Sequence, residues 1–495
     1  MNYCEDCGAP LTPGVLFCEN CGAKIQEITK AFKSEKGLAY TNTALLASQT
    51  GLSKETILSL INQFIADAAS RGLEYEFCDV CEDFKDAGKV EKHLEIISKK
   101  AKQTNFEYLF IIGSSSVIPS EVWKNEACDS ASDSDVSGDL CYATLNLKSP
   151  FSGVKYDFSR SLKVGRLPNC DLAHYFENLK NGCGKIGDIK SFGMSAKVWQ
   201  AETRDIYSHV SSGEVITSPE CTKNNVANLL PADTNLFLFN LHGSDKTEYW
   251  YGQEEASYPE AVEPSSFAGI KNPYFLAVEA CYGALYEGRS PDKSVLLSAI
   301  GGMCISFLGS SRIAFGASEA PGCCADVICD EWLQKVKAGA TGGKALEEAR
   351  KRLMTDKSPE AIKTLAEFSL YGDPSARMKD GSADSGAGNE LLKQVQGDGN
   401  SFSGGKTRSS LVDLPDIHLA VRREIATVDK KISDSIEELV YRQYKELYGV
   451  KPVYYKNYGS NDMNAVFSGK NTLGAKIVNV HFTADGQIKG LLESK

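Results

Sequence analysis

The stretch NPYFLAVEACYGALYEG, residues 272–288, joins an apolar run to reactive side chains. Residues 274–278 have the length and apolar content of a strand buried in a parallel sheet. The run then meets a carboxylate at Glu279, a thiol at Cys281 and a glycine at Gly283. A purely structural cysteine would sit inside the run rather than at its exit. The pattern therefore indicates a site at the C-terminal end of a core strand.

A second stretch, NLFLFNLHGSD at residues 235–245, has the same form and ends in His242 and Gly243. Because the carboxyl ends of parallel strands meet at one edge, we expect this imidazole near the Cys281 thiol. An imidazole favours the thiolate and hands a proton to a leaving amine. His242 and Cys281 are thus the predicted catalytic pair, with the N–H groups of Gly243 and Cys281 as an oxyanion hole. The alternative is a core histidine and a core cysteine in unrelated places.

The rest of the chain alternates apolar strands with amphipathic helices, which is typical of an α/β fold with a parallel sheet. SAKVWQAE (195–202) reads as a further strand, and CADVICDEWLQKVKAG (324–339) as a helix. The acidic stretch EACDSASDSDVSGDL (126–140) predicts an exposed loop at the rim of the sheet.

The N-terminal segment CEDCGAPLTPGVLFCENCGAKI (4–25) holds two Cys-x-x-Cys-Gly pairs around a Pro/Gly turn. Four thiolates at this spacing predict a tetrahedral zinc site in a zinc ribbon. The expected ligands are Cys4, Cys7, Cys18 and Cys21. Four protein ligands leave no open position, so the zinc should be structural rather than catalytic.

The C-terminal part begins with a segment rich in Gly, Ser and Asp, which predicts a flexible linker over 381–412. Residues 417–449 read as one long amphipathic helix, and the alternating segments after it contain an Ala-Asp-Gly turn that supports a hairpin. We therefore expect a small α+β module at 413–495, with a helix against an antiparallel sheet.

The amino-acid composition of the chain argues against some classes of function. The 495 residues are 42% apolar and 24% charged, with a formal net charge of −11. An acidic chain disfavours nonspecific binding to nucleic acid or anionic membranes. The sequence starts without an apolar signal-peptide segment and has no apolar run of membrane-spanning length, so we expect a cytoplasmic protein with reduced cysteines.

Taken in order, the motifs resemble those of the gingipain-like cysteine peptidases of the caspase superfamily, over residues 90–380. The matching segments are YLFIIGSSSVIP, DSDVSGDLCYA, VGRLP, NLHGS, YWYG, AVEACYGA, ISFLGSS and LAEFSLYGDPSARM. The resemblance implies two caspase-like α/β subdomains and a His–Cys pair at His242 and Cys281. It also implies an acidic residue, placed at Glu202 in VWQAETRD, that helps orient the imidazole. No metal or organic cofactor is needed for such chemistry.

The resemblance leaves out the ribbon, the linker and the C-terminal module. We therefore expect five segments: a zinc ribbon (1–26), a first α/β subdomain (34–150), a caspase-like catalytic subdomain (151–380), the linker (381–412) and the C-terminal module (413–495). The predicted fold class is therefore α/β, with caspase/gingipain-like parallel-sheet subdomains and flanking helices.

Substrate preference is predicted from Glu279. Residues two apart on a strand share a face, so Glu279 lies on the side of Cys281 and can form the floor of the substrate pocket. A desolvated carboxylate favours Arg or Lys before the scissile bond. Asp205 is a second acidic candidate for the same pocket. The alternative is that Glu279 pairs with a structural Arg or Lys.

The main hypothesis is thus an intracellular cysteine endopeptidase that acts on protein or peptide substrates. If it cleaves after basic residues, Lys393, Lys406 and Arg408 are candidate self-processing sites in the linker, against the alternative of an uncut linker. The rival hypothesis is a non-catalytic caspase-fold scaffold whose ribbon and C-terminal module bind partners. A regulatory protein partner at either module is compatible with both hypotheses.

Overall fold

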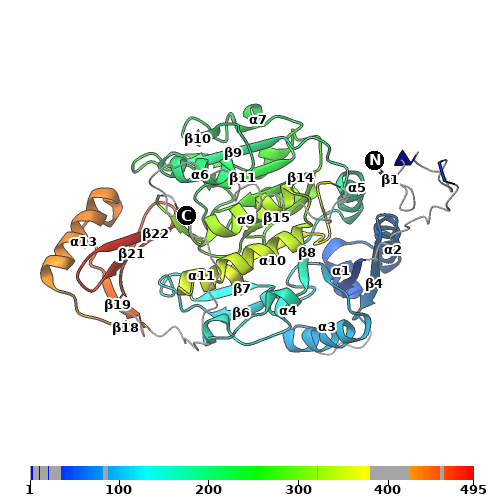
Figure 1. The fold of residues 1–495 in the computed structure, drawn as a ribbon, viewed down its shortest axis with the longest axis horizontal. Helices are drawn as coiled ribbons and strands as arrows, with labels where there is room; N and C mark the ends of the chain where they lie inside the picture. Colours follow the sequence, from blue (N-terminus) through cyan, green and yellow to red (C-terminus); the bar gives the residue numbers. More distant parts are fainter. Residues whose placement is uncertain are drawn as a thin grey trace.

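The structure is a computed structural model that describes residues 2–3, 10–11, 20–21, 35–81, 87–319, 321–379, 423–457 and 462–495. Its main body is a ten-stranded sheet with flanking helices, and a second sheet with one helix lies at one end of the molecule (Figure 1). Among the described residues, none of the helices combines the length and apolar character needed to cross a bilayer.

The ten-stranded sheet consists of two halves. The first half, in spatial order, is β4 (Leu73–Asp79), β3 (Glu35–Thr41), β5 (Tyr108–Ile112) and β8 (Lys163–Leu167). The second half is β17 (Phe368–Gly372), β15 (Cys304–Ser310), β14 (Tyr274–Val278), β11 (Leu236–Asn240), β9 (Ser191–Ala196) and β10 (Val215–Ser218). Neighbouring strands are parallel except β15 and β17. The halves meet where Tyr371 pairs with Arg166, so the first half runs past residue 150 to β8.

Helices cover both faces of this sheet. Side chains of consecutive strand residues point to opposite faces, and Ile305 of β15 lies against Gly182 in α5 whereas Ser306 lies against Gly342 in α10. Contacts link α2 and α8 to α5 on one face, and α9 and α11 to α10 on the other. The helices of this body are α1 (Thr43–Thr50), α2 (Lys54–Ala69), α3 (Val90–Thr104), α4 (Leu140–Thr144), α5 (Leu172–Gly182), α6 (Gln200–Ser208), α7 (Val226–Leu229), α8 (Val295–Gly301), α9 (Ala325–Lys337), α10 (Gly342–Leu353) and α11 (Pro359–Glu367).

The acidic stretch 126–140 is not the exposed loop that its composition predicted. It contains β7 (Asp135–Gly138), which pairs with β6 (Glu121–Lys124), and it buries Asp129 and Asp133. At its end, Asp139 accepts two hydrogen bonds from the buried Arg166, at 2.8 and 2.6 Å. A bidentate pair of this kind holds the stretch against β8. The expectation failed because the cations that neutralise these carboxylates come from distant segments.

The C-terminal module forms a six-stranded sheet that includes one strand of the main body. Its order is β16 (Phe315–Ala317), β22 (Ile488–Ser494), β21 (Ala475–Thr483), β20 (Asp462–Lys470), β19 (Val453–Asn457) and β18 (Arg423–Ile425). The apolar face of α13 (Lys430–Gln443) packs on this sheet through Ile436 and Val440. The predicted helix over 417–449 is too long, because β18 precedes it and Asp429 caps its first turn.

Of the predicted ribbon, the structure describes the antiparallel pair β1 (Asn2–Tyr3) and β2 (Pro10–Leu11), and Cys21 in an exposed turn. Cys4, Cys7 and Cys18 lie outside the described residues, so the zinc site stays a prediction. The predicted linker over 381–412, with Lys393, Lys406 and Arg408, lies outside them as well.

Candidate active site

His242 and Cys281 emerge from adjacent strands at the same level. Phe239 of β11 pairs with Val278 of β14, and each reactive residue follows three positions later. Both side chains line one cavity of about 330 Å³. A Cβ atom at Gly243 would come 1.8 Å from the Cys281 carbonyl oxygen, so only glycine lets the two strand exits approach this closely. The alternative of a histidine and a cysteine in unrelated parts of the core is wrong.

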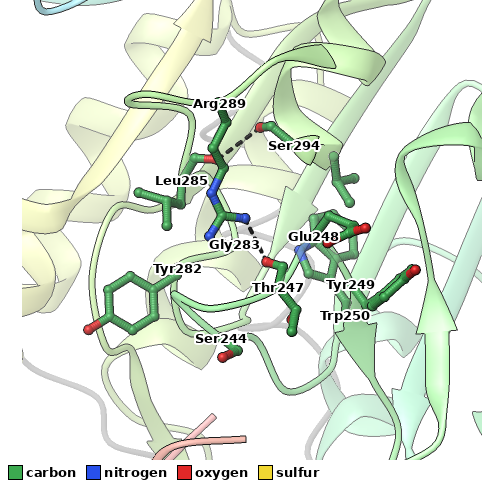
Figure 2. A pocket seen from close by; sticks show the side chains of 11 residues that line it. Ser244, Thr247, Glu248, Tyr249, Trp250, Tyr282, Gly283, Leu285, Arg289 and Ser294 are labelled. Carbon is green, nitrogen blue, oxygen red and sulfur yellow. Dashed lines mark hydrogen bonds between the residues drawn. The ribbon is translucent and has the colours of Figure 1, made fainter. Parts of the chain in front are cut away.

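Arg289 ties together the loops that follow these two strands. Its guanidinium donates to the Thr247 carbonyl and to the Asp245 carbonyl, each at 2.6 Å. Figure 2 shows Arg289 reaching across from the loop after Cys281 to the loop after His242, beside a small hollow. The Ser294 hydroxyl donates to the Leu285 carbonyl at 2.8 Å and closes the same loop. The loops that carry the candidate site are therefore fixed relative to each other.

The imidazole of His242 is oriented by Gln253, which the sequence reasoning missed. Its Nε2 lies 2.7 Å from Gln253 Oε1, while the amide nitrogen of Gln253 donates to the Glu255 carbonyl at 2.9 Å. That second bond fixes the amide, so Nε2 carries the proton and Nδ1 keeps its lone pair. The His242 backbone is held by two 2.8 Å hydrogen bonds to Tyr251, in β12 (Trp250–Tyr251), which pairs with β13 (Glu260–Val262).

Glu202 does not orient the imidazole, and this prediction is wrong. The strand β9 ends at Ala196, and the chain turns into α6, which places Glu202 in the first helical turn. There its Oε2 accepts a hydrogen bond from Asn240 at 3.0 Å. The prediction of one strand over residues 195–202 is wrong, because the residue pattern of so short a segment does not distinguish a strand from the start of a helix.

Both candidate catalytic groups are neutral in this arrangement. Burial, together with the nearby Lys476 and Lys495 ammonium groups, lowers the pKa of His242 to about 3. Burial raises the pKa of the Cys281 thiol to about 12, and the thiol donates to the Ala314 carbonyl at 3.5 Å. A neutral thiol is a poor nucleophile, so burial disfavours the reactive form of this side chain.

Next to this pair, three buried carboxylates converge. Oxygen atoms of Glu202, Glu279 and Asp326 lie within 4.8 Å of one another. Asp326 lies in the first turn of α9 and accepts hydrogen bonds from the N–H groups of Ala317, at 2.6 Å, and Cys323, at 2.9 Å. Burial and then the Asp326 charge raise the pKa of Glu202 to about 8 and that of Glu279 well above its usual range. Buried carboxyl groups this close together either take up protons or pair with a cation.

The Lys495 side chain supplies that cation. Its Nζ lies 3.2 Å from Asp326 Oδ1, 3.6 Å from Glu202 Oε2 and 4.3 Å from the centre of the Trp199 ring. A Cβ atom at Gly316 would come 2.0 Å from the Lys495 Cε, so this glycine leaves room for a long side chain. Neither carboxylate oxygen of Glu279 has a hydrogen-bond partner among the described residues, and the Lys495 charge acts on Glu279 only through space. Asp205 is exposed on the outer side of α6, so its predicted place in the pocket is wrong.

The backbone of Lys495 lies like that of a bound peptide. Its carbonyl oxygen accepts from the Cys281 N–H at 3.3 Å, and its N–H donates to the Ala314 carbonyl at 3.0 Å. The preceding residues pair antiparallel with β16, Ser494 with Phe315 and Glu493 with Gly316. A strand added to an exposed edge is a common mode of peptide recognition. The Cys281 N–H therefore contacts a backbone oxygen, and the predicted oxyanion-hole roles of Cys281 and Gly243 both stay predictions.

Comparison with known proteins supports the fold. No protein-family model and no curated protein sequence matches this chain. The crystal structure of the Arg-specific cysteine proteinase gingipain R (RgpB) matches at a TM-score of 0.50 and 9% identity, over 93% of this chain and 91% of that chain. The complex of the Porphyromonas gingivalis RgpB pro- and mature domains matches at 0.50 and 10% identity, over 93% of each chain. The chain has a gingipain-like fold. The predicted α/β architecture is confirmed.

Within this gingipain-like fold, the acidic stretch 126–140 anchors the segment that leads into β16. Asp133 accepts from the Ile313 N–H at 3.0 Å, and the buried Lys363 donates to the Ile313 carbonyl at 2.8 Å. Lys363 also pairs with Asp129 and, at 3.6 Å, with Glu367. The segment that leads into β16 thus rests on a buried ionic network, which holds this strand in place beside Cys281.

Proposed function

We propose that the protein is a cysteine endopeptidase that uses Cys281 and His242 and cleaves after Lys or Arg. The observation that carries the proposal is the position of Lys495. Its carbonyl oxygen lies on the Cys281 N–H while its ammonium group lies among three carboxylates. One residue therefore occupies at once the place of the scissile carbonyl and the place of a basic side chain. The gingipain-like fold supports this assignment.

The geometry suggests the following steps. A substrate pairs with β16 and places a basic residue where Lys495 lies. The Cys281 thiol gives its proton to the His242 imidazole, and the resulting thiolate attacks the carbonyl carbon, whose oxygen gains negative charge near the Cys281 N–H. The C–N bond breaks as protonated His242 gives a proton to the leaving amine, and a thioester remains. Water, deprotonated by the imidazole, then hydrolyses the thioester and restores the thiol.

Gln253 would act as a positioning residue in these steps. Its amide oxygen holds the Nε2 proton at 2.7 Å, so Nδ1 is the atom that exchanges protons with the reaction. A neutral amide can stabilise the imidazolium by a hydrogen bond without the full pull of a carboxylate. This residue takes the place that Glu202 was predicted to fill.

The three carboxylates would select the substrate. A neutral side chain in this pocket leaves buried charge without a partner, which costs several kcal/mol or forces the carboxyls to take up protons. A lysine ammonium in the substrate would offset this cost by forming ion pairs with the carboxylates, as Lys495 does. An arginine guanidinium could bind two carboxylates at once. Glu202, Glu279 and Asp326 are the proposed specificity residues.

Fluorogenic peptides with Lys, Arg, Met or Asp before the reporter test the proposal. We expect hydrolysis after Lys and Arg by the full chain or by a variant whose pocket is emptied through Lys495→Asp, and Cys281→Ala should abolish it. Cleavage after Asp with none after Lys or Arg would reject the specificity. The non-catalytic scaffold is the rival, and it predicts that neither the full chain nor a variant with an emptied pocket hydrolyses any of the peptides.

Self-processing stays a separate proposal. If Lys393, Lys406 or Arg408 is cut, the purified wild-type chain should contain two pieces and Cys281→Ala one intact chain. Equal intact masses, apart from the substitution, would speak for an uncut linker.

A further inference from the structure

We propose that the strand β22, with Lys495 at its end, is a built-in inhibitor that occupies the substrate cleft of this same chain. The inference rests on the proposed function for the identity of the cleft. It adds that the C-terminal module keeps the cleft closed until β22 is displaced.

Lys495 is not the only residue that holds β22 in place. Beyond the ladder between β22 and β16, Glu493 accepts from the Trp199 indole N–H at 2.8 Å. Its other oxygen lies 2.5 Å from the Lys476 ammonium, and both side chains are buried. Glu493 thus joins the module to the wall of the basic pocket, next to the residue that fills it.

The module also covers the other side of Cys281. The turn between β20 and β21 lines the same cavity as His242 and Cys281. The Ser244 hydroxyl, two residues after His242, donates to the Leu473 carbonyl at 2.8 Å. Farther out, the Tyr258 hydroxyl donates to Glu446 at 3.1 Å. A substrate would meet the module on both sides of the bond to be cut.

The site next to the strand is buried and neutral, as occupation of the cleft by the chain's own strand would require. Cys281 is only 4% exposed with β22 in place, and the Lys495 charge adds to the forces that keep His242 unprotonated. Because the strand is tethered, its local concentration is of the order of millimolar, so a free peptide competes poorly. Activity then requires that a partner or a cut releases the module.

The test is the rate at which iodoacetamide alkylates Cys281, followed by mass spectrometry of the peptide that contains it. Lys495→Asp places a negative charge among the three carboxylates and should expel the strand. Two variants serve as matched controls: Lys495→Arg keeps the cation, and Lys489→Ala removes a half-exposed lysine of the same strand that pairs with Asp462 instead. Thermal unfolding checks that each variant is folded.

We expect alkylation of Lys495→Asp to be at least about 10-fold faster than wild type, because loss of one partner of a buried ion pair shifts an equilibrium by at least that factor. Both controls should react like wild type. The synthetic peptide IKGLLESK, residues 488–495, should slow alkylation of Lys495→Asp. Equal rates for wild type and Lys495→Asp, or no protection by the peptide, would overturn the inference.

Peptide hydrolysis separates this inference from the proposed function. If Lys495→Asp is alkylated faster but cleaves no Lys or Arg peptide, the strand blocks the cleft and the peptidase proposal fails. If wild type already cleaves such peptides as fast as Lys495→Asp, the peptidase proposal holds and the inhibitor inference fails.

Discussion

Replacement of Asp326 by asparagine tests the basic pocket most sharply. The Lys495 ammonium lies closer to Asp326, at 3.2 Å, than to Glu202, at 3.6 Å. The other Asp326 oxygen accepts from the Ala317 and Cys323 N–H groups, and an asparagine oxygen can keep both bonds. The change therefore removes charge from the pocket while it preserves the loop before α9.

The expected loss follows from the distance. Two unit charges 3.2 Å apart attract by about 5 kcal/mol at an effective dielectric of about 20, which is an upper bound. Measured hydrogen bonds to charged groups contribute about 1.5–3 kcal/mol. We take a value within this range, about 2 kcal/mol, or a roughly 30-fold lower kcat/KM for Lys substrates.

The assay compares Lys and Met peptides in the Lys495→Asp background, where the pocket is open. The kcat/KM for the Met peptide should fall only slightly or should rise. Asp330→Asn is the matched control, because Asp330 lies on the same helix but binds His209 and Gln334 away from the pocket. If kcat/KM for the Lys peptide falls by less than about 3-fold, or falls equally for the Lys and Met peptides, the assignment of Asp326 to the basic pocket is refuted.

Four further predictions concern the same site and the ribbon. Gly316→Ala should block the pocket, so in the Lys495→Asp background it should lower the hydrolysis of Lys peptides. In the otherwise wild-type chain it should speed the alkylation of Cys281, because Lys495 no longer fits. Unchanged values in both assays would contradict the close contact between Gly316 and the Lys495 side chain. Gln253→Ala should lower kcat by about 10-fold and shift its pH profile with KM nearly unchanged, whereas a structural role alone would leave the profile in place. The ratio of Lys to Met kcat/KM should rise between pH 7 and pH 9, because the raised pKa of Glu202, about 8, leaves it protonated below that range and charged above it; a flat ratio would argue against this residue. Purified protein should hold about one zinc ion per chain that Cys4→Ser removes, with peptide hydrolysis retained, and metal analysis that finds no zinc in the wild type would reject the ribbon.

The sequence predicted the parts of the fold that depend on local pattern. The apolar runs that end at Val278 and Asn240 form adjacent parallel strands, and the reactive residues just beyond them line one cavity. Length, apolar content and the rule that parallel strands meet at one edge were enough for this. The placement of Glu279 on the side of Cys281, which rests on strand alternation alone, stays a prediction.

The parts that depend on distant partners were not predictable in this way. Asp326 lies on a helix that the sequence indicated, but nothing in the local pattern shows that its first turn faces the strand ends. Gln253 meets His242 only through the short pairing of β12 with the strand exit. Lys495 comes from a module whose docking no periodicity encodes. For Asp129 and Asp133, the buried Lys363 is more than 200 residues away.

The most direct measurement of the central claim uses an irreversible probe with lysine next to a chloromethyl ketone. The Lys495→Asp chain is incubated with the probe and digested, and the labelled residue is mapped by mass spectrometry. We predict one adduct, on Cys281, that Asp326→Asn slows and that an excess of IKGLLESK prevents. An adduct on another cysteine, or equal labelling by a probe with aspartate in place of lysine, would contradict the account.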